Sequence, residues 1–513
     1  MTFAQGVAIA LGRAIIVALI AVPMARAIAR ALPRRLIVAI LAAVWLMPTV
    51  VVGYAYSDGP LSLVRMPLLN EILYTLLLAL KLAPVAVVAI YLAPSPALSD
   101  SARFLRRLAP PCRSNRQRIA EFLATLPHGQ CHAPLLAAAA VMLLAFSDFD
   151  LAALLNGAAG KTTSAGSWSI ALHEAQQLQA PLSALTLRAS LAAACELVIV
   201  GGALWMLGKS LGNEQAVTES SRCLPEAPGS IRRVLLLAWL CAGLIAAAIL
   251  ILPGWVLLRG AVQGAAEFIT HFRLGDELLT SLYFASMSTG AVLLILALTS
   301  ARRSPGSQPK RHARSPRVLL ILLSLPGALG GIVVALLLMR LFSLTPFSLV
   351  LDTPVPLVLG VSLLLLPPAL LLRGLFDAAA PSTAVHLAHL MAQGQPTQRR
   401  AGRAILWRLR GRSWFWLGAV LFALAYFELV VSVTLAPIGM TPAIVELYNQ
   451  MHYGQRALLS AGVVAAMLVP AAVLAVCALA ARWTPPFDPP PTCPIRSGNS
   501  NTSNYRGRLS GRG

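Results

Sequence analysis

Four acidic residues lie within, or at the ends of, long apolar segments of the sequence: Asp148, Asp150, Glu196 and Glu428. A carboxylate is costly at membrane depth, so an acid in such a segment is expected to line an aqueous path or to pair with a base. We therefore treat the four as candidates for the wall of a path across a membrane. For Asp150 and Glu428 a structural role at a helix end is an equally good interpretation.

Four basic residues also fall in or beside the apolar segments: Arg13, Lys81, Arg188 and Arg340. The long side chains of Arg188 and Arg340 can reach the membrane surface from helix ends. Arg13 and Lys81 lie deeper and are expected to face a protein interior or an aqueous path, unless the segment ends are misplaced by a turn. Glu196, near the middle of its segment, could pair with either of these two bases.

Other residue patterns give no sign of a chemical site. The seven cysteines form no CxxC pair, so no disulfide framework is expected. His386 and His389 lie three residues apart and are expected to be solvated. One loop holds cysteines and histidines whose spacing matches no zinc motif, namely Cys112, His128, Cys131 and His132. We expect no cofactor, no bound metal and no enzymatic activity.

The elements that must position these residues are membrane-spanning helices. Of the 513 residues, 58% are hydrophobic and 12% are charged, which is far more apolar than a soluble core of this length requires. A helix of about 20 apolar residues crosses the ~30 Å of bilayer hydrocarbon. We predict an all-α fold, a polytopic transmembrane helical bundle of about eleven helices, at 7–27, 36–57, 72–93, 134–156, 186–208, 234–258, 279–299, 318–341, 355–372, 413–436 and 457–481.

The net charge is +22, and the basic residues that produce it are distributed as this predicted topology requires. Of the 41 lysine and arginine residues, 32 fall in alternate loops and five in the loops on the other side. This positive-inside bias predicts an N-terminus outside and a C-terminus in the cytoplasm. Because the basic residues follow topology, we expect no nucleic-acid partner. The basic loops are 26–35, 94–133, 209–233, 301–317, 373–412 and the tail from 482.

The two halves of the chain share short matches in the same order. LMP at 46–48 corresponds to SLP at 324–326, and FDL at 149–151 corresponds to FEL at 427–429, both at an offset of 278. SIALHEAQQLQ and AIVELYNQMHYG match at an offset of 274. Such a series predicts a tandem duplication. The predicted domains are a first repeat of five helices at 1–208, a cytoplasmic linker at 209–233, a second repeat with one extra leading helix at 234–483 and a disordered basic tail at 484–513.

Two stretches carry a resemblance to a known family. The first is FALAYFELVVSVTLAPIGMTPAIVELYNQMHYGQ, in which Pro437, Gly439 and Thr441 follow the Phe427-Glu428 pair. The second is GRAIIVALIAVPMARAIARALPRRLIVAILAAVWLMPTVVVGYAY. Together with the duplication, they resemble the permease subunit of ATP-binding cassette importers, in particular the fused two-copy permeases of the ferric-iron type.

The resemblance implies a permease of the cell inner membrane that moves solute from periplasm to cytoplasm by alternating access, with ferric iron as the leading substrate. It implies three kinds of partner, namely cytoplasmic ATP-binding cassette ATPase subunits, a periplasmic solute-binding protein and the lipid bilayer. The four acids would then be candidates for the translocation path.

The resemblance also implies two cytoplasmic loops that couple to the ATPase, each with a Glu-Ala-Ala triplet, a glycine and a later Leu-Pro pair. In the second half the glycine is Gly394, but Ala388 and His389 stand within the altered triplet. In the first half the pair Leu126-Pro127 is present, but the glycine is missing. Because both loops depart from the pattern, the alternative is an ATP-independent transporter or a non-transporting membrane scaffold derived from a permease.

Overall fold

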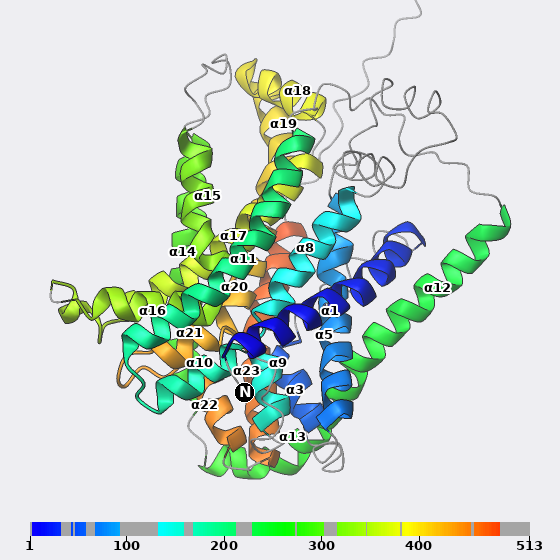
Figure 1. Ribbon diagram of the computed structural model, residues 1–513. Helices are drawn as coiled ribbons and strands as arrows, with labels where there is room; N and C mark the ends of the chain where they lie inside the picture. Colours follow the sequence, from blue (N-terminus) through cyan, green and yellow to red (C-terminus); the bar gives the residue numbers. More distant parts are fainter. Residues whose placement is uncertain are drawn as a thin grey trace, which may run out of the picture.

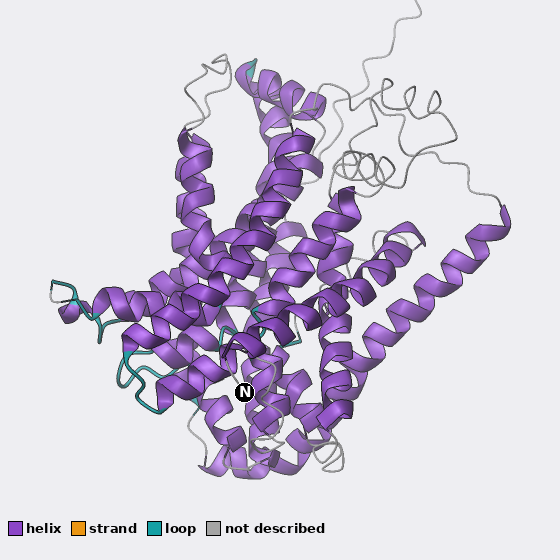
Figure 2. Cartoon of the chain, viewed as in Figure 1, coloured by secondary structure: helices purple, strands orange, loops and turns teal. Residues whose placement is uncertain are grey.

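Helices form every regular element in the part of the chain that the structure describes (Figure 2). The all-α prediction is confirmed for this part. Most of the predicted linker and the whole tail from 484 lie outside it. The computed structural model describes residues 3–31, 43–44, 47–57, 67–92, 132–157, 168–211, 228–271, 274–301, 315–344, 346–379, 382–452 and 456–482.

Six helices in the described residues are long and apolar enough to cross a membrane. Each coincides with a predicted span. One of them is longer than predicted, because α12, a π-helical turn (η4) and α13 together form an apolar helix over Val234–Phe268. The six are built from α1 (Phe3–Ala31), α5 (Pro67–Leu92), α11 (Leu182–Leu211), α12 (Pro228–Ala246) with η4 (Ala247–Ile251) and α13 (Leu252–His271), α14 (Gly275–Ala301) and α23 (Arg456–Arg482).

Three predicted spans are interrupted, so the described residues contain fewer continuous spans than the eleven predicted. The segment 134–156 divides into α8 (His132–Phe146) and α9 (Asp150–Gly157), and 413–436 divides into α20 (Arg412–Tyr426) and α21 (Val430–Leu435). The segment 318–341 divides into α15 (Ser315–Ala328) and α16 (Gly331–Phe342), which meet at 115° and count as a seventh span if taken together.

The interruptions have local causes. Asp148 and Glu428 offer carboxylate oxygens to backbone N–H groups of the helices that follow them, which favours a new helix start over continuation. At the third break, Gly330 has a φ of 83°. This left-handed conformation is available to glycine at little cost and turns the chain out of the helix. Figure 1 shows α15 running along the bundle and α16 running across it.

Two other predicted spans are described in part or lie within a longer helix. The segment 36–57 lies partly outside the described residues, and its end forms α3 (Thr49–Ser57). The segment 355–372 lies wholly within one continuous helix, α17 (Pro354–Ala379). The remaining elements are α10 (Trp168–Gln177), η5 (Ser348–Val350), α18 (Ser382–Gln393), α19 (Pro396–Leu406), η6 (Trp407–Gly411) and α22 (Ala443–His452).

The long helices pack into one bundle around a continuous apolar core (Figure 1). Helices α1, α5 and α8 pack on one another, as do α14, α17 and α20. Helix α11 links the two groups, because it contacts α8 and also α16, which packs on α17. Figure 1 shows α18 and α19 at one end of the bundle and α10, α22 and α13 at the other.

Small residues let α13 and α23 approach closely. A Cβ on Gly264 would lie 2.1 Å from the carbonyl oxygen of Ala457, and one on Gly260 would lie 2.3 Å from Oγ of Ser460. The sequence GAVQG is thus a GxxxG contact of the kind that holds helices together in membranes. The Ser460 hydroxyl also donates to the hydroxyl of Tyr54 on α3, 3.3 Å away. Residues far apart in sequence are therefore joined at this contact.

Candidate functional site

Ionisable side chains gather where the helices are interrupted. We call this group the polar cluster. Its members interact through hydrogen bonds, ion pairs or electrostatic attraction and repulsion, and they come from α1, α5 and the starts of α9 and α21. The members are Arg13, Glu71, Tyr74, Lys81, Asp148, Asp150 and Glu428.

Arg13 links α1 to α5. Its Nε donates to Oε1 of Glu71 at 2.5 Å, and its guanidinium lies over the ring of Tyr74, 4.5 Å from the ring centre. The Arg13 side chain is 4% exposed and the Glu71 side chain is 40% exposed, so the pair extends from the interior to the surface. The Tyr74 hydroxyl donates to Oδ2 of Asp148 at 2.9 Å. Helices α1 and α5 and the α8–α9 break are therefore one hydrogen-bonded unit.

Lys81 occupies the other end of the same face of α5. Its Nζ donates to the carbonyl oxygen of Met47 at 2.9 Å, just before α3. The ammonium group also interacts electrostatically with Asp150 and Asp148. Both deep bases, Arg13 and Lys81, thus face the polar cluster, in agreement with the prediction that they turn inward.

Asp150 and Glu428 come from different halves of the chain and interact electrostatically at the polar cluster. Asp150 interacts electrostatically with Asp148, Lys81 and Glu428. The Glu428 carboxylate accepts hydrogen bonds from the backbone N–H groups of Val431 and Ser432, at 3.0 to 3.1 Å. Glu428 therefore has the helix-end role that was one of its two interpretations.

Asp150 differs from Glu428 although the two occupy matching sequence positions. Asp148, two residues earlier, is the acid that accepts from the start of α9, through the N–H of Ala152 at 3.2 Å. Oδ1 of Asp150 is buried and has no hydrogen-bond partner among the described residues. Asp150 is thus the acid of the cluster whose charge is least satisfied by hydrogen bonds.

Glu196 does not pair with Arg13 or Lys81, which corrects the suggested ion pair. Its side chain is fully buried, and neither carboxylate oxygen has a hydrogen-bond partner in the described part of the chain. Arg13 has Glu71 instead, and Lys81 has the Met47 carbonyl. The free-energy cost of removing the Glu196 carboxyl group from water is therefore not offset by hydrogen bonds in the described part of the chain.

A glycine pair separates Glu196 from Glu428. A Cβ on Gly330 would lie 2.8 Å from Cβ of Ser147 and 3.7 Å from Oε1 of Glu196. A Cβ on Gly331 would lie 3.3 Å from Oε1 of Glu428. The α15–α16 break is thus wedged between carboxylates from α11 and from the start of α21. These glycines leave room for groups from both halves of the chain.

The predicted coupling residues of the second half lie on a helical hairpin formed by α18 and α19, away from the polar cluster. Ala388 is fully buried, because it faces Gly402 on α19, where a Cβ would lie 2.7 Å from the Ala388 carbonyl oxygen. Gly394 lies in the turn, and His389 is half-buried. Leu126 and Pro127, the predicted coupling residues of the first half, lie outside the described residues.

Sequence reasoning missed Glu71, Tyr74 and the glycine pair. A helical signal existed for the first two, because Glu71, Tyr74 and Lys81 recur at spacings of three and seven and so share one face of α5. The role of Gly330 and Gly331 depends on which side chains approach them, and this is a tertiary property.

The arrangement holds more acids than bases at a place where several helices start, so it can bind a cation or exchange a proton. Within the described ranges, no three His, Cys, Asp or Glu side chains converge as a metal site would need. Comparisons of the chain with models of protein families, with curated proteins and with solved structures found no match.

Proposed function

We propose that the chain is the membrane-spanning permease subunit of an importer that moves solute across the cell inner membrane by alternating access. One observation carries the proposal. Helices from both halves of the chain are interrupted side by side, and their breaks meet at a buried polar cluster. Interrupted helices that present polar groups near the middle of a bundle are typical of transporter binding sites, whereas a purely structural bundle has no need of them.

Matched packing supports the proposed tandem repeat. The trio α1, α5 and α8 corresponds to α14, α17 and α20, and the pair α3 and α9 corresponds to α16 and α21. Helix α10 packs on α11 as α22 packs on α23. We propose domains at 1–208 and 234–483, joined by a linker at 209–233 and followed by a tail from 484.

The ATPase partner is proposed to bind the hairpin of α18 and α19. The hairpin lies at one end of the bundle (Figure 1), and it exposes Leu387 and Leu390 together with the basic residues Arg399 and Arg400. An apolar ridge beside positive charge fits a protein groove better than a membrane interior. Ferric iron as substrate and a periplasmic solute-binding protein as second partner rest on the sequence resemblance.

Purification of the tagged protein from its native membrane in mild detergent tests the proposal. We expect an ATP-binding cassette subunit to co-purify at about two copies per permease, as two coupling loops imply. Leu387→Glu with Leu390→Glu should abolish co-purification, because two charges replace the exposed apolar ridge. Asp150→Asn, in the polar cluster, is the matched control and should retain the subunit. Reproducible absence of any ATPase with an intact, monodisperse protein would contradict the proposal.

The altered coupling loops and the acid-rich cluster favour an ATP-independent transporter as the second candidate. In proteoliposomes without nucleotide, this candidate predicts that a pH or sodium gradient drives uptake of the proposed substrate, ferric iron. Asp150→Asn should then abolish uptake, and the hairpin variant should retain it. A scaffold without transport activity predicts no flux under either condition.

A further inference from the structure

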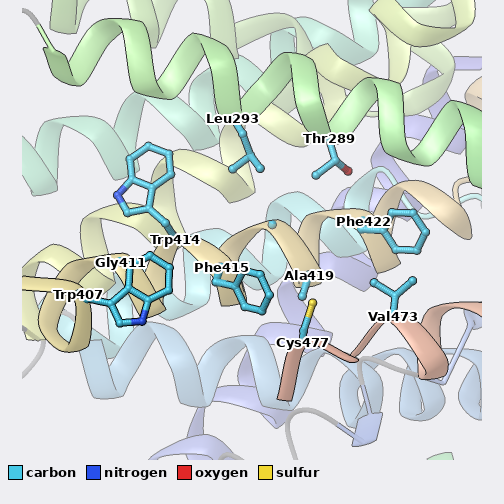
Figure 3. Close-up of a pocket in the computed structure, with 11 residues that line it drawn as sticks. Thr289, Leu293, Trp407, Gly411, Trp414, Phe415, Ala419, Phe422, Val473 and Cys477 are labelled. Atoms are coloured by element: carbon cyan, nitrogen blue, oxygen red, sulfur yellow. The ribbon is translucent and has the colours of Figure 1, made fainter. Parts of the chain in front are cut away.

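A long apolar groove lies between α14, the η6–α20 segment and α23, with a volume of about 610 Å³ (Figure 3). Leu293 of α14, Trp414 and Phe422 of α20, and Val473 and Cys477 of α23 line it. No member of the polar cluster does. We propose that this groove binds an anionic phospholipid, with an acyl chain along α20 and the phosphate beside the arginines at the start of that helix.

The groove has the length of one lipid chain. It follows α20 from Gly411 to Phe422, which at 1.5 Å per residue is about 16 Å. An acyl chain in one leaflet spans half of the ~30 Å of hydrocarbon, or about 15 Å. The lining is apolar and aromatic apart from Thr289 and Cys477, so it suits a hydrocarbon chain and not a charged solute.

Trp407 lies at one end of the groove, and its ring packs closely against Gly411. A Cβ on Gly411 would lie 2.2 Å from a carbon of the Trp407 ring, so glycine at this position is what lets the ring lie against the π-helical turn. Trp407 is 46% exposed. Tryptophan with an apolar body and a polar N–H prefers the level of lipid headgroups. Figure 3 shows Trp407 and Trp414 at one end and Phe422 and Val473 at the other.

Positive charge is concentrated at this same end. Arg408, Arg410 and Arg412 flank the lining residues Trp407 and Gly411 in sequence, and all three are exposed. Arginine beside an interfacial pocket is well suited to bind a phosphate, through charge and paired N–H donors. The guanidinium of Arg373 is already engaged, because it donates to the Leu296 carbonyl and lies 5.0 Å from the centre of the Trp414 ring.

The inference goes beyond the proposed function and requires only that these helices lie in a bilayer. Native mass spectrometry of the full chain in detergent tests it, with phosphatidylglycerol and phosphatidylethanolamine of identical acyl chains added at equal concentration. We expect the protein to bind phosphatidylglycerol about tenfold more tightly. Arg410→Gln with Arg412→Gln should remove this preference. Arg399→Gln with Arg400→Gln, on α19, changes the charge equally and should leave it intact.

A second variant tests the groove itself. Gly418 lines the groove, and a Cβ there would meet only Leu293, at 3.2 Å. Gly418→Leu should therefore fill the groove and lower binding of both lipids, without lowering the thermal unfolding temperature of lipid-free protein. Bound lipid should also protect Cys477 from a membrane-permeant thiol reagent, as read from the modified peptide. Equal binding of the two lipids, equal loss in both arginine variants, or a dimer that excludes lipid would overturn the proposal.

Discussion

At the scale of single residues, the acids of the chain differ in how the fold satisfies them. Glu428 accepts from two backbone N–H groups and Asp148 accepts from Tyr74 and Ala152. Glu196 is fully buried and has no hydrogen-bond partner in the described residues. An unpaired charge in such a place is costly, so we expect Glu196 to hold a proton in the folded protein.

A pair of matched substitutions tests this difference. Glu196→Gln should leave the free energy of unfolding within about 0.5 kcal/mol of the unsubstituted protein, or raise it, because it replaces an acid that must take up a proton on folding by a group of similar shape that is neutral in both states. Glu428→Gln should lower it by about 1–2 kcal/mol, because charge-assisted hydrogen bonds to the start of α21 are weakened. Denaturant unfolding in detergent measures both. An equal loss in the two variants would show that Glu196 has a partner.

Two buried tyrosines give a second residue-scale comparison. The Tyr74 hydroxyl donates to Asp148, whereas the Tyr426 hydroxyl is buried without a hydrogen-bond partner in the described residues. Tyr74→Phe should therefore destabilise the protein by about 1–2 kcal/mol, since it leaves a carboxylate oxygen with one donor fewer. Tyr426→Phe should be neutral or stabilising. Thermal unfolding of both variants decides the matter, and a larger loss for Tyr426→Phe would contradict the assigned hydrogen bonds.

At the scale of elements, interrupted helices and close helix contacts organise the bundle. The helix through α12, η4 and α13 continues past Pro253, which has no N–H. In the π-helical turn the Leu252 N–H bonds to the Ala247 carbonyl, five residues back, so the same pattern leaves the Ala248 carbonyl without a donor from Pro253. The π-helical turn there widens the helix, and the carbonyl of Ala248 in this turn accepts from the hydroxyl of Tyr56 at 3.0 Å. The carbonyl that Pro253 leaves without a backbone donor is thus hydrogen-bonded by a side chain from α3.

The contact between α13 and α23 can be tested with two glycines of the same long helix. Gly264→Leu places a side chain against the Ala457 backbone and should destabilise the protein by about 3 kcal/mol or more, because the helices must separate. Gly243→Leu is the control, because no atom lies within 4 Å of a Cβ there. The thermal unfolding temperature should fall for the first variant alone. Similar falls for both would mean that leucine acts through the helix itself rather than through the contact.

At the scale of the whole molecule, the chain places α18 and α19 at the end of the bundle opposite α10, α22 and α13 (Figure 1). The charge distribution predicts that the hairpin end is cytoplasmic, since the loop 373–412 is among the basic ones. The importer proposed above would bind its energy source at the hairpin end and take in solute at the other end.

The proposed orientation has a direct test. Single cysteines introduced at Arg399 and at Asp352, in a variant without the native cysteines, should react differently with a membrane-impermeant maleimide added to intact cells. We expect labelling at 352 and protection at 399 until the membrane is permeabilised, because the two positions lie in loops on opposite sides of the predicted topology. The reverse pattern would invert the topology, and labelling at both positions would place them on one side.

The sequence by itself determined the class of the protein and the positions of its long helices. Apolar segments of sufficient length form helices in any membrane environment, because the backbone must satisfy its own hydrogen bonds there. Six predicted spans accordingly appear as continuous helices. The acids at 148, 150 and 428 were identified as candidates because charge is rare in such segments, and the structure places all three in one cluster.

Only the tertiary structure decided how those helices are interrupted and which groups meet. Whether 134–156 or 413–436 continues as one helix depends on whether an acid caps a new helix start or faces solvent, and apolar periodicity does not distinguish these outcomes. The partner of Arg13 proved to be Glu71 and not Glu196, because pairing depends on the rotation and packing of α1 against α5. The need for glycine at 330 and 331 also depends on tertiary structure, because the side chains that approach these two positions come from segments distant in sequence.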